Sequence, residues 1–134
     1  MKTLSILLSL CLATTATAAQ ADLIPAKELE GIRAKESVFA VASRNKPIVL
    51  KSTRDGEKYF GKEALVKLSK AVDFQEEKVL VFAWRGSGGD RLTLAKPGGN
   101  PGQVQFIYRP GRTRDLRPHV KVFVIGAGAQ WTVK

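Results

Sequence analysis

Six consecutive residues of the chain are apolar and mostly branched or aromatic: Val79-Leu80-Val81-Phe82-Ala83-Trp84. A strand with one face in water would carry polar residues at every second position, because successive side chains point to opposite faces. A continuous apolar run of this length is typical of a central strand that is covered on both faces. We therefore predict a strand here, with other elements packed on each side of its sheet.

Downstream of this run, the sequence alternates apolar and other residues in four short segments, as half-buried strands do. Turn-forming glycine, proline, asparagine and aspartate residues separate the segments. These segments are residues 91–95, 103–109, 120–125 and 130–134. Within each segment, in the same order, one predicted face carries Leu92 and Leu94; Val104, Phe106 and Tyr108; Val120, Val122 and Val124; and Trp131 and Val133.

Upstream of the run, the pattern is mixed. Ser37 to Ser43 alternates as a strand, and Ile48 to Thr53 is a second β-like segment that could pair with it, followed by a turn at Arg54 to Glu57. From Phe60 to Val72, apolar residues recur at the spacing of one face of an amphipathic helix. Ala26 to Lys35 fits either a short helix or a loose amino-terminal arm.

Together these segments predict a mainly β (α+β) fold, either a small antiparallel β-sandwich or a partly open barrel, with one amphipathic helix. Residues 20–35 are assigned to an amino-terminal arm and residues 36–134 to a single β-rich domain. Their number suits one hydrophobic core and leaves no room for a second full domain.

Residues 1–19 are predicted to be a secretory signal peptide. Lys2 gives the segment a positively charged amino-terminal region, and Leu4 to Ala13 form a mostly apolar central region. Ala16 to Ala19 provide the small residues that a signal peptidase requires, with cleavage expected after Ala18 or Ala19. Threonines interrupt the apolar stretch before it reaches the roughly 20 residues of a membrane span. We therefore expect an exported protein, periplasmic or secreted, with no integral membrane segment after cleavage.

The predicted signal peptide contains Cys11, which is the only cysteine of the chain. The mature protein is therefore expected to have no disulfide and no thiolate ligand or nucleophile.

Basic residues concentrate in the second half of the chain. Residues 20–77 carry 11 Lys and Arg against 10 Asp and Glu, whereas residues 78–134 carry 10 against 2. Such a field favours an anionic partner, which could be a nucleic acid, an anionic glycan, a lipid surface or an acidic protein patch. The alternative is a solubilising surface charge with no dedicated partner.

Two loops are the candidate binding sites. The first is a glycine loop, and it is predicted to be a flexible hairpin whose glycines permit positive φ, because it lacks the third glycine and the following helix of a dinucleotide site. The second is a proline-bounded loop with four arginines and a histidine, side chains suited to phosphate, sulfate or carboxylate, although a merely solvated loop is the alternative. The candidate binding residues are Arg85, Gly86, Ser87, Gly88, Gly89, Asp90 and Arg91, then Arg109, Arg112, Arg114, Arg117 and His119.

No catalytic or metal-binding set is predicted. His119 is the only histidine, so a histidine-rich metal site is excluded. Ser87, His119 and Asp115 could form a triad, but no nucleophile-elbow context surrounds the serine. Asp90 and Asp115 each lie next to arginine in the sequence, and local ion pairs explain them adequately. We therefore expect no enzyme activity and no cofactor.

Asp73-Phe74 precedes the predicted central strand, Ser87-Gly88-Gly89 follows it as a glycine turn, and Arg117-Pro118-His119 precedes a later run of alternating valines. With these motifs, the chain from about Ile48 to Lys134 resembles the PrcB-type domains of bacterial exported proteins, although the glycine turn lacks that family's proline and Arg117-Pro118-His119 matches its Pro-Tyr-His-like element only in part. The resemblance implies a small β-rich module associated with protease complexes.

The chain is more distantly similar to the chagasin-type cysteine protease inhibitors. These proteins present loops at one end of a sandwich. Their Asn-Pro-Thr-Thr-Gly and Arg-Pro-Trp elements are absent here.

The sequence thus predicts a non-enzymatic exported binding or accessory domain. Its expected partner is a protease or another protein of the envelope or the medium, held through the two loops. The alternative is a polyanion-binding protein that uses the arginine loop on an envelope glycan, a lipid head group or a nucleic acid.

Overall fold

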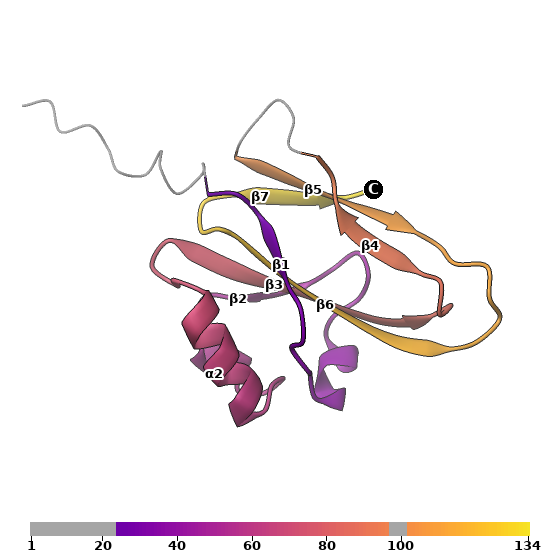
Figure 1. Cartoon of the computed structure of the whole chain (residues 1–134), viewed down its shortest axis with the longest axis horizontal. Coiled ribbons are helices and arrows are strands. Elements are labelled where there is room, and N and C mark those ends of the chain that lie inside the picture. The colour runs from indigo at the N-terminus through magenta and orange to yellow at the C-terminus, as the bar shows by residue number, and fades with distance from the viewer. Residues whose placement is uncertain (1–23, 97–101) are drawn as a thin grey trace, which may run out of the picture.

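The structure is a computed structural model that describes residues 24–96 and 102–134 (Figure 1). The predicted signal peptide, including Cys11, lies outside the described residues. The described elements, in chain order, are β1 (Lys27–Leu29), the 3-10 helix η1 (Glu36–Ala40), β2 (Ile48–Leu50), the 3-10 helix η2 (Arg54–Gly56), α2 (Lys62–Ala71), β3 (Glu77–Gly86), β4 (Arg91–Leu94), β5 (Gln103–Arg109), β6 (Arg117–Gly126) and β7 (Gln130–Val133).

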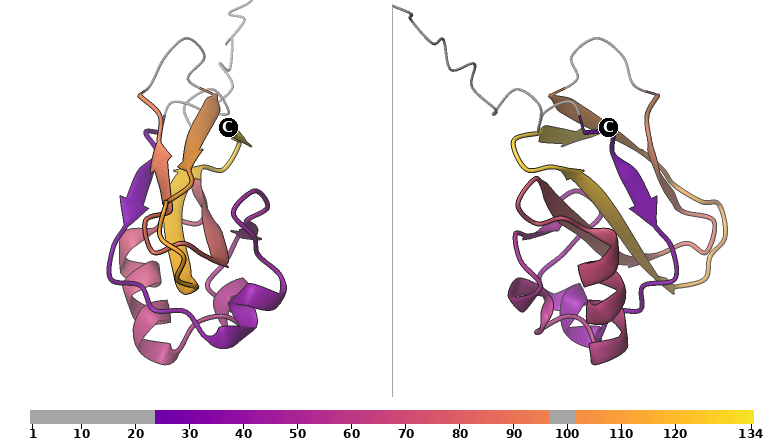
Figure 2. Two further views of the ribbon diagram at one scale, coloured as in Figure 1. Left: turned by 90° about the vertical axis from the view of Figure 1, so that its right-hand side faces the viewer. Right: turned by 60° about the vertical axis from the view of Figure 1, so that its left-hand side comes forward.

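The strands form two sheets. One is antiparallel with the order β1-β6-β3-β2, and the other has the order β4-β5-β7. In Figure 1, α2 lies on one side of the four-stranded sheet and the three-stranded sheet on the other. Figure 2 shows the same layers from two further directions. The fold is therefore a small α+β sandwich, and of the two predicted architectures the sandwich is confirmed.

Strand β3 contributes to two separate hydrophobic cores, as its continuous apolar sequence predicts. Val79, Val81 and Ala83 pack with α2 and η1 in the first core. Leu80, Phe82 and Trp84 pack against the three-stranded sheet in the second core. Alternation along the strand, combined with cover on both faces, explains why no polar residue interrupts the run.

The neighbouring strand β6 divides its side chains in the same way. Val122 and Val124 face the first core, whereas Phe123 and Ile125 face the second. In the three-stranded sheet, every second residue faces the second core, as predicted. These inward residues are Leu92, Leu94, Val104, Phe106, Tyr108, Trp131 and Val133.

The amphipathic helix is confirmed as α2. Ala64 and Leu68 are buried against the first core, and Leu65 and Ala71 are partly buried beside them. No helix among the described residues is both long enough and apolar enough to cross a membrane.

The prediction of a strand at Ser37 to Ser43 is wrong, because most of this segment belongs to η1. Val38 and Ala42 are both buried, and the amide of Ala42 donates to the carbonyl of Val38 at 2.9 Å. A separation of four residues between buried positions belongs to a helical turn, and Val41 is accordingly 56% exposed. The predicted pairing of this segment with residues 48–53 is therefore wrong too, and β2 pairs with β3 instead.

Two further expectations differ from the structure. Residues 26–35 form neither a helix nor a loose arm, because β1 pairs with the edge of β6 and Glu28 forms an ion pair with Lys121 at 2.9 Å. The sandwich is also not wholly antiparallel, since β7 runs parallel to β5. Both pairings join segments remote in sequence, and local patterns carry no signal for them.

Candidate functional site

The two predicted loops both cross from one sheet to the other at the same end of the sandwich. Residues 87–90 connect β3 to β4, and residues 110–116 connect β5 to β6. Both connections lie at the right-hand end of the molecule in Figure 1. The glycine loop is therefore not the predicted hairpin, because the strands that it joins belong to different sheets.

Three backbone amides donate hydrogen bonds directly from one loop to the other. The Gly88 amide donates to Asp115 Oδ1 at 3.0 Å, the Gly111 amide donates to Asp90 Oδ1 at 2.7 Å, and the Thr113 amide donates to Ser87 Oγ at 3.1 Å. We call the joined surface, residues 85–91 and 109–119, the loop platform. All twelve residues that the sequence singled out for binding lie on it.

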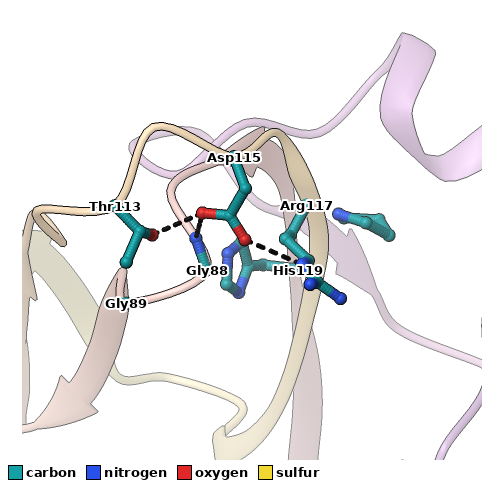
Figure 3. A pocket seen from close by; sticks show the side chains of 7 residues that line it. Gly88, Gly89, Thr113, Asp115, Arg117 and His119 are labelled. Atoms are coloured by element: carbon teal, nitrogen blue, oxygen red, sulfur yellow. Dashed lines mark hydrogen bonds and ion pairs between the residues drawn. The ribbon is translucent and has the colours of Figure 1, made fainter.

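Asp115 organises the centre of the loop platform (Figure 3). Its Oδ1 accepts from the Thr113 hydroxyl and the Gly88 amide, and its Oδ2 accepts from Arg117 Nε at 2.8 Å. These donors, with the Thr113 hydroxyl contributing most, hold the pKa of the carboxyl group well below its ordinary value. The predicted local ion pair between Asp115 and arginine is confirmed.

Asp90 does not use the arginine beside it as a hydrogen-bond donor. Its Oδ1 accepts from the Gly111 amide and its Oδ2 from the indole Nε1 of Trp84 at 3.1 Å. The Gly111 hydrogen bond is the main reason that the pKa of Asp90 lies below its ordinary value, and Trp84 adds to it. Asp90 therefore holds the opposite loop and the central strand, rather than balancing Arg91.

His119 links the glycine loop to the central strand β3 through a hydrogen bond and a ring contact. Its Nε2 lies 2.7 Å from the carbonyl oxygen of Ser87, and a carbonyl can only accept, so Nε2 carries the proton. The imidazole stacks on the Trp84 ring with 4.9 Å between centroids and 12° between planes. The hydroxyl of Ser87 lies 2.6 Å from Thr113 Oγ1. Ser87, His119 and Asp115 thus lie close together, but these contacts are not those of a catalytic triad.

A broad hollow of about 520 Å³ lies over the junction of the loops. The side chains of Thr113, Asp115 and His119 on its wall are already engaged in hydrogen bonds with the other loop or within their own. Among the described residues, no group of three His, Cys, Asp or Glu side chains is arranged to hold a metal ion. The full lining is Gly88, Gly89, Thr113, Asp115, Arg117, Pro118 and His119.

The arginines of the loop platform fall into two groups. Arg85 pairs with Glu36 and lies 4.7 Å from the centre of the Phe39 ring, and Arg117 pairs with Asp115. The other four are exposed and have no carboxylate partner among residues 24–96 and 102–134: Arg91, Arg109, Arg112 and Arg114.

The glycines serve close approach of the two backbones, not positive φ. Gly31 is the one described residue with positive φ, so the predicted role of the loop glycines is wrong in this respect. A Cβ atom on Gly89 would lie 3.2 Å from the Cα atom of Gly111, and one on Gly111 would lie 2.6 Å from the Cα atom of Gly89. The two backbones can therefore lie this close only because both positions lack a side chain.

Several residues that the site uses were not singled out by the sequence, although Gly111, Thr113 and Leu116 lie within the predicted arginine loop. Gly111 and Thr113 contact the first loop, and Trp84 anchors Asp90 from the strand. Leu116 is 74% exposed, the highest value among the large hydrophobic residues that the structure describes. In the sequence, the only indication that Leu116 is exposed is its position between the charged residues Asp115 and Arg117 in a loop.

We expect the contacts between the loops to weaken in acid. The pKa values of Asp90 and Asp115 are lower in the folded state than their ordinary value near 3.8, so folding favours the ionised forms. The stabilisation is therefore fully present above about pH 5 and declines as pH falls toward the folded-state values. Thermal unfolding between pH 2 and 6 should show a shallower fall for Asp115→Asn than for the wild type. If the unfolding temperatures of the two proteins fell in parallel as the pH is lowered, this expectation would be contradicted.

Comparison with known proteins does not identify a relative of the chain. No family model, no curated protein and no solved structure matches the chain. The PrcB-like and chagasin-like resemblances stay predictions that rest on the motifs quoted above.

Proposed function

We propose that the chain is a non-enzymatic binding domain of an exported protein, and that its loop platform docks a partner protein with a negatively charged surface. The observation that carries this proposal is the joining of the two loops by hydrogen bonds across Asp90 and Asp115. A contact surface that is already ordered loses less conformational entropy when its partner binds. The proposed mechanism is docking, with no bond made or broken by this chain.

The exposed side chains of the platform suit a protein partner. Leu116 offers an apolar side chain at the surface, and Arg112 and Arg114 lie exposed on the same loop. Arginine is enriched among the residues that dominate binding energy, and an apolar residue becomes valuable once the partner removes it from water. The charge of the second half of the chain, 10 basic against 2 acidic residues, supports an acidic partner surface.

The replacement Leu116→Ser tests the protein-docking proposal. The mature protein is used to isolate its partner from envelope extract, and the affinity is then measured with the purified partner. We expect Leu116→Ser to weaken binding about tenfold or more, because burial of one leucine contributes roughly 1.5–3 kcal/mol. Thermal stability should not change, since the side chain is already in water.

Val66→Ser on α2 is the matched control, because Val66 is 51% exposed and far from the platform in the chain. It should leave the affinity unchanged. Equal affinity for the wild type and Leu116→Ser would contradict docking through this part of the platform.

A polyanion is the second candidate partner, favoured by the four arginines without a carboxylate partner among the described residues. The double variant Arg112→Ala with Arg114→Ala, compared with Leu116→Ser, separates the two candidates. Polyanion binding should collapse in the double variant, lose its steep dependence on salt and stay unchanged in Leu116→Ser, whereas docking to one protein should be weakened by both changes.

A further inference from the structure

Arg91 and Arg109 lie directly opposite each other on neighbouring strands. They are register partners at the platform end of β4 and β5. The next residues inward, Leu92 and Tyr108, pack in the second core, so alternation places both arginines on the outer face of the sheet. Side chains at such positions start from Cβ atoms about 4.5–5.5 Å apart. Two exposed guanidinium groups are therefore held within reach of one small ligand.

Neither of these two arginines pairs with a carboxylate in the part of the chain that the structure describes. The only acidic residues after residue 77 are Asp90 and Asp115. Both oxygens of Asp90 accept from Trp84 and Gly111, and both oxygens of Asp115 accept from donors within the loops. Neither arginine forms an ion pair within residues 24–96 and 102–134.

Like charges placed directly opposite on paired strands destabilise a sheet. An anion bound between them would reverse this effect, because each guanidinium presents N–H groups in a planar fork that fits tetrahedral oxyanions and carboxylates. A group with three or four oxygens offers separate acceptor atoms to the parallel N–H groups of each fork, whereas a chloride ion is a single acceptor atom.

We propose that Arg91 and Arg109 form a binding site for one tetrahedral oxyanion, a phosphate or sulfate group. Both arginines stand at the margin of the loop platform, on the outer face of β4 and β5. The site deepens the polyanion candidate, which uses the same two arginines, and it does not depend on Leu116 or on the hydrogen bonds that join the loops.

The test compares Arg91→Gln and Arg109→Gln with the wild type, and Arg54→Gln, an exposed arginine in η2, serves as the matched control. The affinity for inorganic phosphate and for sulfate is measured by NMR titration at constant ionic strength in chloride buffer. We expect each of the two site variants to lose about tenfold or more in affinity, because charge-assisted hydrogen bonds contribute roughly 1.5–3 kcal/mol. Arg54→Gln should bind as the wild type does.

A second measurement separates a site from general surface charge. In chloride alone, each site variant should unfold at the same temperature as the wild type or higher, because the repulsion is gone. Added phosphate should raise the unfolding temperature of the wild type and of Arg54→Gln, but not that of the site variants. An equal phosphate effect in all four proteins, or a lower unfolding temperature of the site variants in chloride, would overturn the proposal.

The source of the oxyanion is tested with vesicles of phosphatidylglycerol against vesicles of phosphatidylcholine. Binding to the former that both site variants lose would assign a lipid phosphate. Phosphate binding without vesicle binding would support a soluble phosphorylated or sulfated ligand. Leu116→Ser must keep the full phosphate effect, so failure of the docking proposal and failure of this site are told apart.

Discussion

Replacing Phe82 with alanine is expected to lower the free energy of unfolding by about 3–5 kcal/mol. The side chain is fully buried in the second core. Its ring meets Phe123 of the same sheet at a centroid distance of 5.9 Å, and Phe106 and Trp131 of the opposite sheet at 5.0 and 6.3 Å. The mutation would therefore leave a cavity at the point where the two sheets are held together.

Urea denaturation followed by tryptophan fluorescence would measure the effect. Since small domains are stable by only about 5–15 kcal/mol, the variant should begin to unfold at low urea concentration. Phe82→Leu should recover most of the loss, because it restores much of the volume. Val66→Ala on the exposed face of α2 should change the stability by no more than about 0.5 kcal/mol. A loss of less than 1 kcal/mol for Phe82→Ala would contradict the two-core description.

The second large effect is expected at Gly111, where the loops approach most closely. A Cβ atom at this position would lie 2.5 Å from the carbonyl carbon and 2.6 Å from the Cα of Gly89. Both are backbone atoms, which no side-chain rotation can move away. Gly111→Ser should therefore push the loops apart and break the hydrogen bond from the Gly111 amide to Asp90. We expect a loss of about 1–3 kcal/mol, the usual cost of overpacking.

The matched control is Gly61→Ser at the amino terminus of α2. A Cβ atom there meets nothing within 4 Å, φ is −76°, and serine is favoured at this position of a helix. Amide hydrogen exchange gives a local readout: in Gly111→Ser, the amides of Gly88 and Thr113 should lose protection, while those of β3 and β6 keep theirs. Unchanged protection at Gly88 and Thr113 would show that the loops are not held together as described.

The strands could be predicted wherever burial produces a regular pattern of apolar residues in the sequence. Residues 79–84 are apolar throughout because β3 faces two cores, and residues 103–109 alternate because β5 faces one. The segment around Val38 was not predictable in the same way, because a short run of small and branched residues fits both a strand and a helical turn. Strand β1 has three residues, and its pairing with β6 depends on chain nearly a hundred positions away.

The two loops of the candidate site were predictable as contact segments, but the hydrogen bonds that join them were not. Glycine and arginine content identifies each loop as exposed and suited to contact. Whether two loops meet depends on which sheet each strand joins, and strand order is a property of the whole fold. The role of Asp90 illustrates this: its neighbour in the sequence is Arg91, yet its hydrogen-bond partners are Trp84 and Gly111.

The placement of β6 between β1 and β3 has a consequence for how the chain reaches its native state. Lys27 pairs with Val124, and Val79 pairs with Val124 from the other side. The four-stranded sheet can form only after residues 27–126 are all available. Domains dominated by such remote pairings acquire their structure slowly, on the order of milliseconds to seconds. Until β6 arrives, the hydrophobic segment Val79–Trp84 stays uncovered, and the newly made chain is open to chaperones and to aggregation.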